Sequence, residues 1–526
     1  MAVNSIYFLL FLLVLFLLYY AVCPMKYRWG ALLIGSIFFY VTACAASPFY
    51  ILVTGIVVWT AGMCVERCEK NLTHERESNP NRTKMQEKQA AAKCKKQKKR
   101  IVTVAVLINL GILAVLKYGG LFGGIVNRML LFTGYSLAVP QFLAPLGISY
   151  YTLISIGYLI DLYKGKVKVQ RNFLKVMLFV SFFPQITQGP LSRYRQLGGQ
   201  LYEGHAYDYH NLSFGCQRML WGFFKKMVIA ERMQPLVQTI FEHYESYSGV
   251  TCFLGCVYMT VWMYADFSGY MDIVSGACEL FGIRLEENFR RPFLAESLAE
   301  YWRRWHITLS SWFRDYMFYP LAVSSPAVKF GKLGRKWFGV RIGKLFPSLF
   351  ALCFVWTATG LWHDASIKYI LWGVANGVVI MGAMVLEPAF HSAKCALHIQ
   401  EESKAWHIFC KFRTFLLVSA LKIFPGAVSG GAVLGMAKKF VFDVRLPGSL
   451  EEIFPGMQVA DVAILAVSLT FFLLVDLFEE KKQLRDALAT KPFGVRWCSY
   501  AFLLTAILCL GKFGIDMTGG FAYAQY

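Results

Sequence analysis

The sequence predicts an all-α, polytopic membrane protein with about 11–13 transmembrane helices and further re-entrant or interfacial helices. Two observations support this fold class: 56% of the 526 residues are hydrophobic, and apolar runs recur along the whole chain. Many runs approach the roughly 20 residues that a perpendicular helix needs to cross a bilayer, and the shorter ones suit tilted or re-entrant segments. No gap between them is long enough for a separate soluble domain, so we expect a single membrane-embedded domain over residues 1–526.

Basic residues gather in polar segments between the apolar runs. The formal net charge is +22, and residues 66–100 end in KCKKQKKR. Because Lys and Arg accumulate on the cytoplasmic side of membrane proteins, we expect residues 66–100 to form a cytoplasmic loop, as solvated helix or disorder, and the N-terminus to lie outside. The lipid bilayer accounts for this charge and no nucleic-acid recognition motif is present, so we expect no nucleic-acid partner.

The fourteen cysteines are scattered, many of them within apolar runs, and no C-x-x-C pair occurs. Buried free cysteine behaves as a small hydrophobic residue. We therefore expect neither a disulfide framework nor a metal site.

A histidine at the junction of two apolar segments is the first functional candidate. His363 lies within SLFALCFVWTATGLWHDASIKYILWG. Ionisable groups in a bilayer are costly, and a neutral imidazole can accept or donate a proton near pH 7. The alternative is that His363 only caps a helix at the membrane interface, beside Asp364.

The second candidate is the stretch EYWRRWHITLSSWFRDYMFYPL, residues 300–321. At helical spacing, four apolar side chains share one face and three polar ones line the adjacent stripe: Trp302, Trp305, Leu309 and Trp312, then Arg303, His306 and Ser310. This pattern predicts an amphipathic interfacial helix with its aromatic side in lipid and its cations toward headgroups or an anionic ligand. A plain interfacial anchor would not require His306.

Two further stretches interrupt the apolar pattern. FFPQITQGPLSRYRQL (182–197) contains two prolines and a glycine and supplies Arg193. Irregular backbone at membrane depth must be buried in protein or line a cavity. YADFSGYMDIVSGACELFG (264–282) places Asp266 and Asp272 within or just after an apolar segment. For these two carboxylates, a packing or capping role is as open as a direct one.

Five blocks, in order along the chain, resemble the membrane-bound O-acyltransferases. The longest runs from Asp266 to Leu321 and contains DFSGYMDI, NFRRPF and the WRRWH stretch. The others are PLGISYYTLISIGYLIDLYKG (145–165), FFPQITQGPLSRY (182–194), GLWHDASIKYILWGVANG (360–377) and FAYAQY (521–526). The pattern is most similar to the AlgI branch of polysaccharide O-acetyltransferases, and the DltB branch of D-alanyl transferases is more distant.

The resemblance implies a bundle of membrane helices around a central funnel, with the catalytic core in residues 264–377. It identifies His363 as the central catalytic residue, a general base for an acceptor hydroxyl. His306 would be the second catalytic histidine, nearer the cytoplasmic mouth, with Arg303 and Arg304 available to a phosphate-bearing donor. Four further residues are expected to support the site or bind the donor: Asp315, Asp266, Asn288 and Arg193.

The resemblance also implies the substrates and the location. The expected donor is acetyl-CoA, arriving from the cytoplasm, with no tightly bound cofactor. The acceptor would be an extracytoplasmic polysaccharide or the serine of an extracytoplasmic SGNH-type partner that completes the transfer. The membrane would be the bacterial cytoplasmic membrane. Two alternatives stay open: D-alanylation of teichoic acid from a carrier protein, and transport of a polysaccharide or solute.

Two positions depart from the branch pattern. Asp364 follows the GLWH motif where glycine is usual, and its carboxylate could raise the pKa of the neighbouring imidazole. Phe424-Pro425 stands where Phe-Arg is common. Neither departure removes a histidine.

Overall fold

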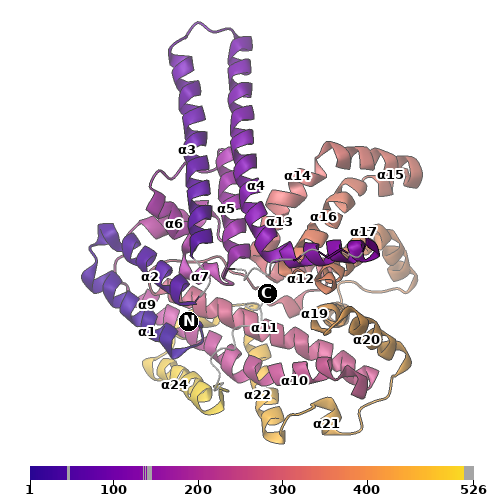
Figure 1. The fold of residues 1–526 in the computed structure, drawn as a ribbon. Coiled ribbons are helices and arrows are strands. Elements are labelled where there is room, and N and C mark those ends of the chain that lie inside the picture. The colour runs from indigo at the N-terminus through magenta and orange to yellow at the C-terminus, as the bar shows by residue number, and fades with distance from the viewer. Residues whose placement is uncertain (44–47, 134, 137, 139–144, 514–526) are drawn as a thin grey trace. The chain divides into compact units, whose positions relative to one another are not determined.

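The computed structural model describes residues 1–43, 48–133, 135–136, 138 and 145–513, and most of these residues are helical (Figure 1). Within these ranges the one isolated β-bridge joins Phe289 and Trp305. The all-α class is therefore confirmed. The FAYAQY block at 521–526 lies outside the described residues. The chain divides into two compact units: unit 1 comprises 1–215 and 274–286, and unit 2 comprises 216–273 and 287–526.

Six described helices are long and apolar enough to cross a membrane, or seven if one bent helix pair forms a single span. The six are α3 (Phe49–Glu77), α4 (Lys84–Leu130), α11 (Gly249–Glu279), α17 (Ile367–Ala396), α22 (Val459–Glu479) and α24 (Phe493–Leu510). In the bent pair, α15 (Ser325–Gly343) and α16 (Phe346–His363) meet at 96°. This count is below the about 11–13 spans predicted, because several apolar runs form shorter or interrupted helices. The polytopic membrane class nevertheless stands.

Unit 1 is built from the N-terminal helices. Besides α3 and α4 it contains α1 (Ile6–Leu17), α2 (Arg28–Ala43), α5 (Ile148–Tyr163), α6 (Phe173–Ser181), α7 (Phe183–Ile186), α8 (Tyr194–Tyr202) and the start of α9 (Tyr209–Phe223). The predicted stretch 182–197 contains α7 and the start of α8, and its helical structure is broken by the turn between them. Gly189 is required in this turn, because a Cβ there would lie 2.0 Å from the Pro184 carbonyl oxygen. Arg193 is the N-cap residue of α8 and is half-buried.

The basic segment 66–100 is helical rather than disordered. It forms the facing ends of α3 and α4, which extend side by side beyond the other helices of unit 1 (Figure 1). α4 begins with a capping box between Thr83 and Gln86, a local signal that starts a helix without tertiary support. Ion pairs from Lys98 to Glu69 and from Arg76 to Glu87 join the two helices.

Unit 2 contains the two candidate histidines. Its remaining elements, besides the end of α9, are the π-helical segment η4 (Phe224–Ala230), α10 (Glu231–Glu242), α12 (Leu298–Arg304), α13 (Ile307–Phe313), η7 (Arg314–Phe318), α14 (Tyr319–Ala322), α18 (Lys404–Ala420), α19 (Ile423–Gly426), α20 (Gly430–Phe442), α21 (Leu450–Ile453) and α23 (Leu484–Ala489). α16 packs closely on α17 through Gly360 and Gly373. A Cβ at either glycine would lie 2.3 Å from a carbonyl oxygen of the other helix. This close approach fixes the turn after His363.

The prediction of one amphipathic helix over residues 300–321 is wrong. α12 ends at Arg304, Trp305 is extended, and His306 has left-handed backbone angles (φ 46°, ψ 53°) before α13 begins. The aromatic side chains do not face lipid either: Trp305 is 1% exposed and Trp312 is 8% exposed within the protein. The cause is backbone pairing with residues 288–290, since the Arg290 N–H donates to the Arg304 carbonyl at 2.9 Å and interrupts the helical ladder.

Candidate active site

The left-handed conformation of His306 is held by hydrogen bonds on both sides. The bridge between Phe289 and Trp305 precedes it, and the Ile307 N–H donates to the Asn288 carbonyl at 3.0 Å. A residue other than glycine at positive φ costs on the order of 1–3 kcal/mol and persists only where its surroundings fix it. The sequence folds this way because the 288–290 segment captures the chain between α12 and α13.

Asn288 also fixes the tautomer of His306. Its side-chain oxygen accepts hydrogen bonds from the Thr308 N–H at 3.0 Å and the Thr308 hydroxyl at 2.9 Å, and it lies 3.1 Å from His306 Nδ1. A backbone N–H can only donate, so the atom that receives it must be the amide oxygen. His306 Nδ1 must therefore carry the proton, and Nε2 holds a free lone pair.

This lone pair is buried and available. His306 is 1% exposed, and its Nε2 atom has no hydrogen-bond partner among the described residues. The ring of Phe267 contacts the imidazole edge-on, with 5.0 Å between centroids. Burial lowers the pKa of His306 to about 3, because a low-dielectric site disfavours the imidazolium. His306 is thus a neutral hydrogen-bond acceptor and a weak base.

His363 is the last residue of α16, as predicted for a histidine at the junction of two apolar segments. It is 4% exposed, and its ring lies 5.0 Å from the rings of Trp362 and Trp372. Trp362 also contacts His306, with 6.1 Å between ring centroids. The structure therefore brings the two predicted histidines, 57 positions apart in the chain, to one aromatic side chain. We call His306, His363, Asn288 and Trp362 the histidine site.

Asp364 does not pair with the imidazole beside it. Its backbone is extended (φ −154°, ψ 151°) and its side chain is half-buried. In the described part of the chain, no hydrogen bond or ion pair joins the Asp364 carboxylate to His363.

The other predicted site residues occupy different surroundings. Asn288 belongs to the histidine site, whereas Asp266 forms a buried ion pair with Lys226, with 2.6 Å between Nζ and Oδ1. Arg303 is exposed. Arg304 pairs with Glu300 at 2.9 Å, and Asp315 pairs with Arg314 at 3.0 Å. Arg193 belongs to unit 1.

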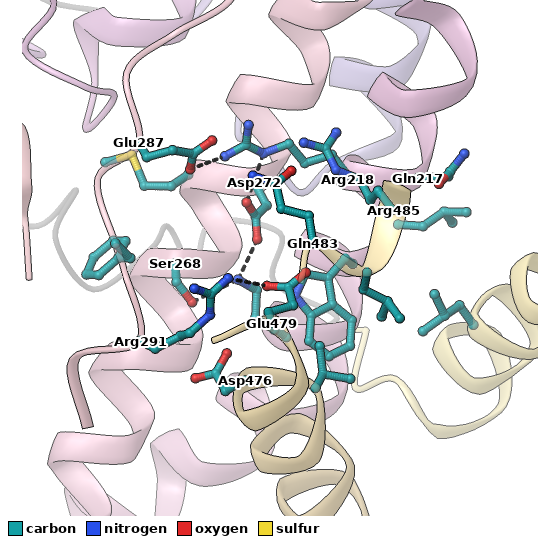
Figure 2. A pocket seen from close by; sticks show the side chains of 18 of the residues that line it. Gln217, Arg218, Ser268, Asp272, Glu287, Arg291, Asp476, Glu479, Gln483 and Arg485 are labelled. Atoms are coloured by element: carbon teal, nitrogen blue, oxygen red, sulfur yellow. Dashed lines mark hydrogen bonds and ion pairs between the residues drawn. The ribbon is translucent and has the colours of Figure 1, made fainter. Parts of the chain in front are cut away.

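A cavity of about 240 Å³ in unit 2 is lined by Asn288, the residue that holds His306. Figure 2 shows this cavity from close by. Polar side chains gather around it from α9, from α11, from residues 287–291, from the end of α22 and from the segment after α22: Gln217, Arg218, Ser268, Asp272, Glu287, Arg291, Asp476, Glu479, Gln483 and Arg485. We call it the polar cavity. It is lined on one side by the same backbone segment that shapes the histidine site.

The cations of the polar cavity differ in the lengths of their ion pairs. Asp272 binds Arg218 at 3.0 Å and Lys225 at 2.6 Å. Arg291 pairs with Glu479 at 3.3 Å, and both side chains line the cavity (Figure 2). The Nε–H of Arg291 is buried without a hydrogen-bond partner among the residues that the structure describes. Arg291 therefore has donor capacity left for an anionic ligand.

Three buried lysines were missed by the sequence reasoning, which considered a histidine and the carboxylates Asp266 and Asp272 within apolar segments but no lysine. Lys225 and Lys226 lie in WGFFKKMVIA, and Lys422 lies in SALKIFPG. All three side chains are buried. The rule that marked His363, a costly ionisable group inside an apolar run, applies equally to lysine and would have identified them.

In comparisons with known proteins, the chain is similar to membrane acyltransferases. Residues 166–334, which include His306, match the model of MBOAT, the membrane-bound O-acyltransferase family. A probable alginate O-acetylase AlgI from Pseudomonas putida is 29% identical over 545 residues, 100% of this chain and 100% of the relative. A peptidoglycan O-acetyltransferase from Helicobacter pylori is 29% identical over 360 residues, 62% of this chain and 64% of the relative. A teichoic acid D-alanyltransferase from Bacillus subtilis is 28% identical over 242 residues, 45% of this chain and 58% of the relative.

Proposed function

Since the chain belongs to the membrane-bound O-acyltransferase family, we propose that it O-acetylates an extracytoplasmic polysaccharide with acetyl groups taken from acetyl-CoA on the cytoplasmic side. The observation that carries this proposal is the meeting of His306 and His363 at Trp362, with the Nε2 lone pair of His306 buried and unpaired among the described residues. The relatives are an alginate O-acetylase and a peptidoglycan O-acetyltransferase, which supports the acetyl group and a polysaccharide acceptor.

The transfer itself needs one proton acceptor and no redox partner. A histidine accepts the proton of an acceptor hydroxyl as its oxygen forms a bond to the acyl carbon. The carbon–sulfur bond of the thioester then breaks, and the histidine returns the proton to the leaving thiolate. The products are an O-acetyl ester and free CoA. A well-placed base contributes roughly 10²–10⁴-fold to such a reaction.

The two histidines suit different parts of this reaction. Burial makes His306 a weak base, so its free Nε2 is suited to accept a hydrogen bond that orients a substrate hydroxyl or amide. That leaves His363 as the base for the acceptor hydroxyl. Its position at the end of α16, at the closely packed turn into α17, gives it a fixed place beside Trp362 and Trp372.

The polar cavity is the proposed approach for the phosphate-bearing part of the donor. Positive charge gathers at this end of unit 2: residues 480–492 after α22 contain four Lys or Arg, whereas residues 443–458 before α22 contain only Arg445. This asymmetry favours a cytoplasmic position for the cavity end. By the same rule, we propose a cytoplasmic side for the basic hairpin 66–100 and an outside N-terminus.

The acceptor would reach the histidine site from the opposite side of the bacterial cytoplasmic membrane. It is either the polysaccharide itself or the serine of an SGNH-type partner, which would pass the acetyl group on. Either acceptor offers a hydroxyl to His363, so the chemistry within this chain is the same.

The test uses inside-out membrane vesicles that contain the full-length protein and receive labelled acetyl-CoA. We expect label in the glycan, loss of at least about 100-fold in that label with His363→Ala, and severe loss with His306→Ala. Both variants should remain inserted in the membrane. Full activity of His363→Ala would refute its role as base. Label arriving only from a D-alanyl carrier thioester would support D-alanylation instead, and glycan export without label would support transport.

A further inference from the structure

Lys422 is a buried cation beside the histidine site. It lies between α18 and α19, is 3% exposed, and its ammonium nitrogen is 5.3 Å from the ring centroid of Trp305, the residue before His306. No hydrogen bond or ion pair connects its side chain to another residue in the described part of the chain. One turn earlier, the Ser419 hydroxyl is also buried without a hydrogen-bond partner among the described residues.

The segment that carries Lys422 contacts residues next to both histidines. On one side, the ammonium rests on Trp305. On the other, Lys368 at the start of α17 donates to the carbonyls of Pro425 and Ala427, at 3.4 and 3.2 Å. The next residue on α17, Tyr369, stacks on the His363 ring with 6.2 Å between centroids. Lys422 therefore lies in the segment that joins the surroundings of His306 to those of His363.

Such a cation is costly for the fold. Removing an ammonium from water without an anionic partner is unfavourable, and the cation–π interaction with an indole ring offsets only part of this desolvation free energy. Burial lowers the pKa of Lys422 to about 8, so the ammonium form still predominates at neutral pH. If the side chain served packing alone, a methionine of similar length would serve better, because it carries no charge.

We propose that the Lys422 ammonium binds the carbonyl oxygen of the acyl thioester and stabilises the oxyanion that forms during transfer. When the acceptor oxygen adds to the acyl carbon, the carbonyl π electrons move onto its oxygen, which Lys422 holds by an N–H···O⁻ hydrogen bond. When the carbonyl re-forms, the carbon–sulfur bond breaks and the thiolate takes the proton held by the histidine. This inference rests on the proposed acyl transfer and supplies the anion stabiliser that the reaction needs.

Lys422→Met tests the proposal in the full-length protein, with Lys438→Met as the matched control. Lys438 is an exposed lysine on α20, outside the histidine site. We expect Lys422→Met to lower kcat by about 100-fold or more with little change in the KM for acetyl-CoA. Its thermal unfolding temperature in detergent should be unchanged or higher, because an unpaired buried charge is removed. Lys422→Arg should retain part of the activity, and Lys438→Met should resemble the wild type.

The outcomes separate this inference from the proposed function. If the wild-type protein transfers no label from acetyl-CoA, the proposed function fails. If the wild type is active and Lys422→Met stays within about twofold of it, the role of Lys422 is refuted. A clear drop in unfolding temperature that accounts for the lost activity would show a structural lysine. Lys422→Ala decides that case: ethylammonium, but not ethanol, should restore turnover if the missing group is the cation.

Discussion

Unit 2 contains two kinds of buried lysine, one held in ion pairs and one without an anionic partner among the described residues. Lys226 is 1% exposed and binds Asp266 at 2.6 Å and Glu231 at 2.9 Å. Lys422 is 3% exposed, and its ammonium lies 5.3 Å from the Trp305 ring centroid, without an ion pair to any described residue. The same kind of group is thus neutralised at one place and left without an anion at the other.

This difference distinguishes charged groups that stabilise the fold from groups that are available for catalysis. A paired buried charge holds helices in register, and removing one partner leaves the other as an uncompensated buried charge. A buried polar group without a hydrogen-bond or ion-pair partner among the described residues costs stability and is available to a ligand, as for Lys422 and for Nε2 of His306. The comparison predicts that variants at the paired charges mainly alter stability, whereas variants at the histidine site mainly alter turnover.

Asp266→Ala should give the largest change in stability. It removes the carboxylate from the buried Lys226 ammonium, and breaking a buried pair in this way costs about 3–5 kcal/mol. Glu231 remains near Lys226 and should keep the loss at the lower end. Thermal unfolding in detergent measures it, and the double variant Asp266→Leu/Lys226→Met should recover much of the stability. A stable Asp266→Ala protein without acetylation would instead place Asp266 in the chemistry.

Asn288→Ala should have an intermediate effect, on turnover more than on stability. Without the amide oxygen, His306 can adopt the other tautomer and lose its free Nε2. We expect a fall in kcat of roughly 10–100-fold, as for other residues that orient a functional histidine, with a small change in KM. Asn288→Asp keeps an acceptor for Nδ1–H and Thr308 and should retain more activity. Equal loss in both variants, in proportion to unfolding, would reduce Asn288 to a structural role.

The sequence was sufficient for features that depend on local pattern. Apolar runs predicted the helical membrane class, and the position of His363 between two apolar segments predicted the end of a helix there. The polar composition of residues 66–100 left helix and disorder open, and the capping box at Thr83 belongs to the helix that forms.

The sequence was insufficient where backbone segments far apart in the chain determine the local conformation. Periodicity in residues 300–321 indicated one helix, but residues 288–290 pair with the chain at Arg304 and turn His306 into a left-handed conformation. No spacing rule connects these segments. The same holds for Lys422, whose burial on Trp305 depends on contact between segments 117 positions apart.

Arg291→Gln should give the smallest effect on activity. It tests the difference between the firmly paired cations of the polar cavity and Arg291. Arg218 and Lys225 are held by Asp272, whereas Arg291 has longer ion pairs and a buried Nε–H without a partner among the described residues. Its loss should therefore raise the KM for acetyl-CoA, by roughly threefold to tenfold, because a solvent-screened cation near phosphate contributes about 1 kcal/mol. The kcat should change little, and the salt dependence of KM should weaken. Lys481→Gln, outside the cavity lining, is the matched control. If both variants raise KM equally, the donor responds to the general positive potential of this end of unit 2 and not to the cavity.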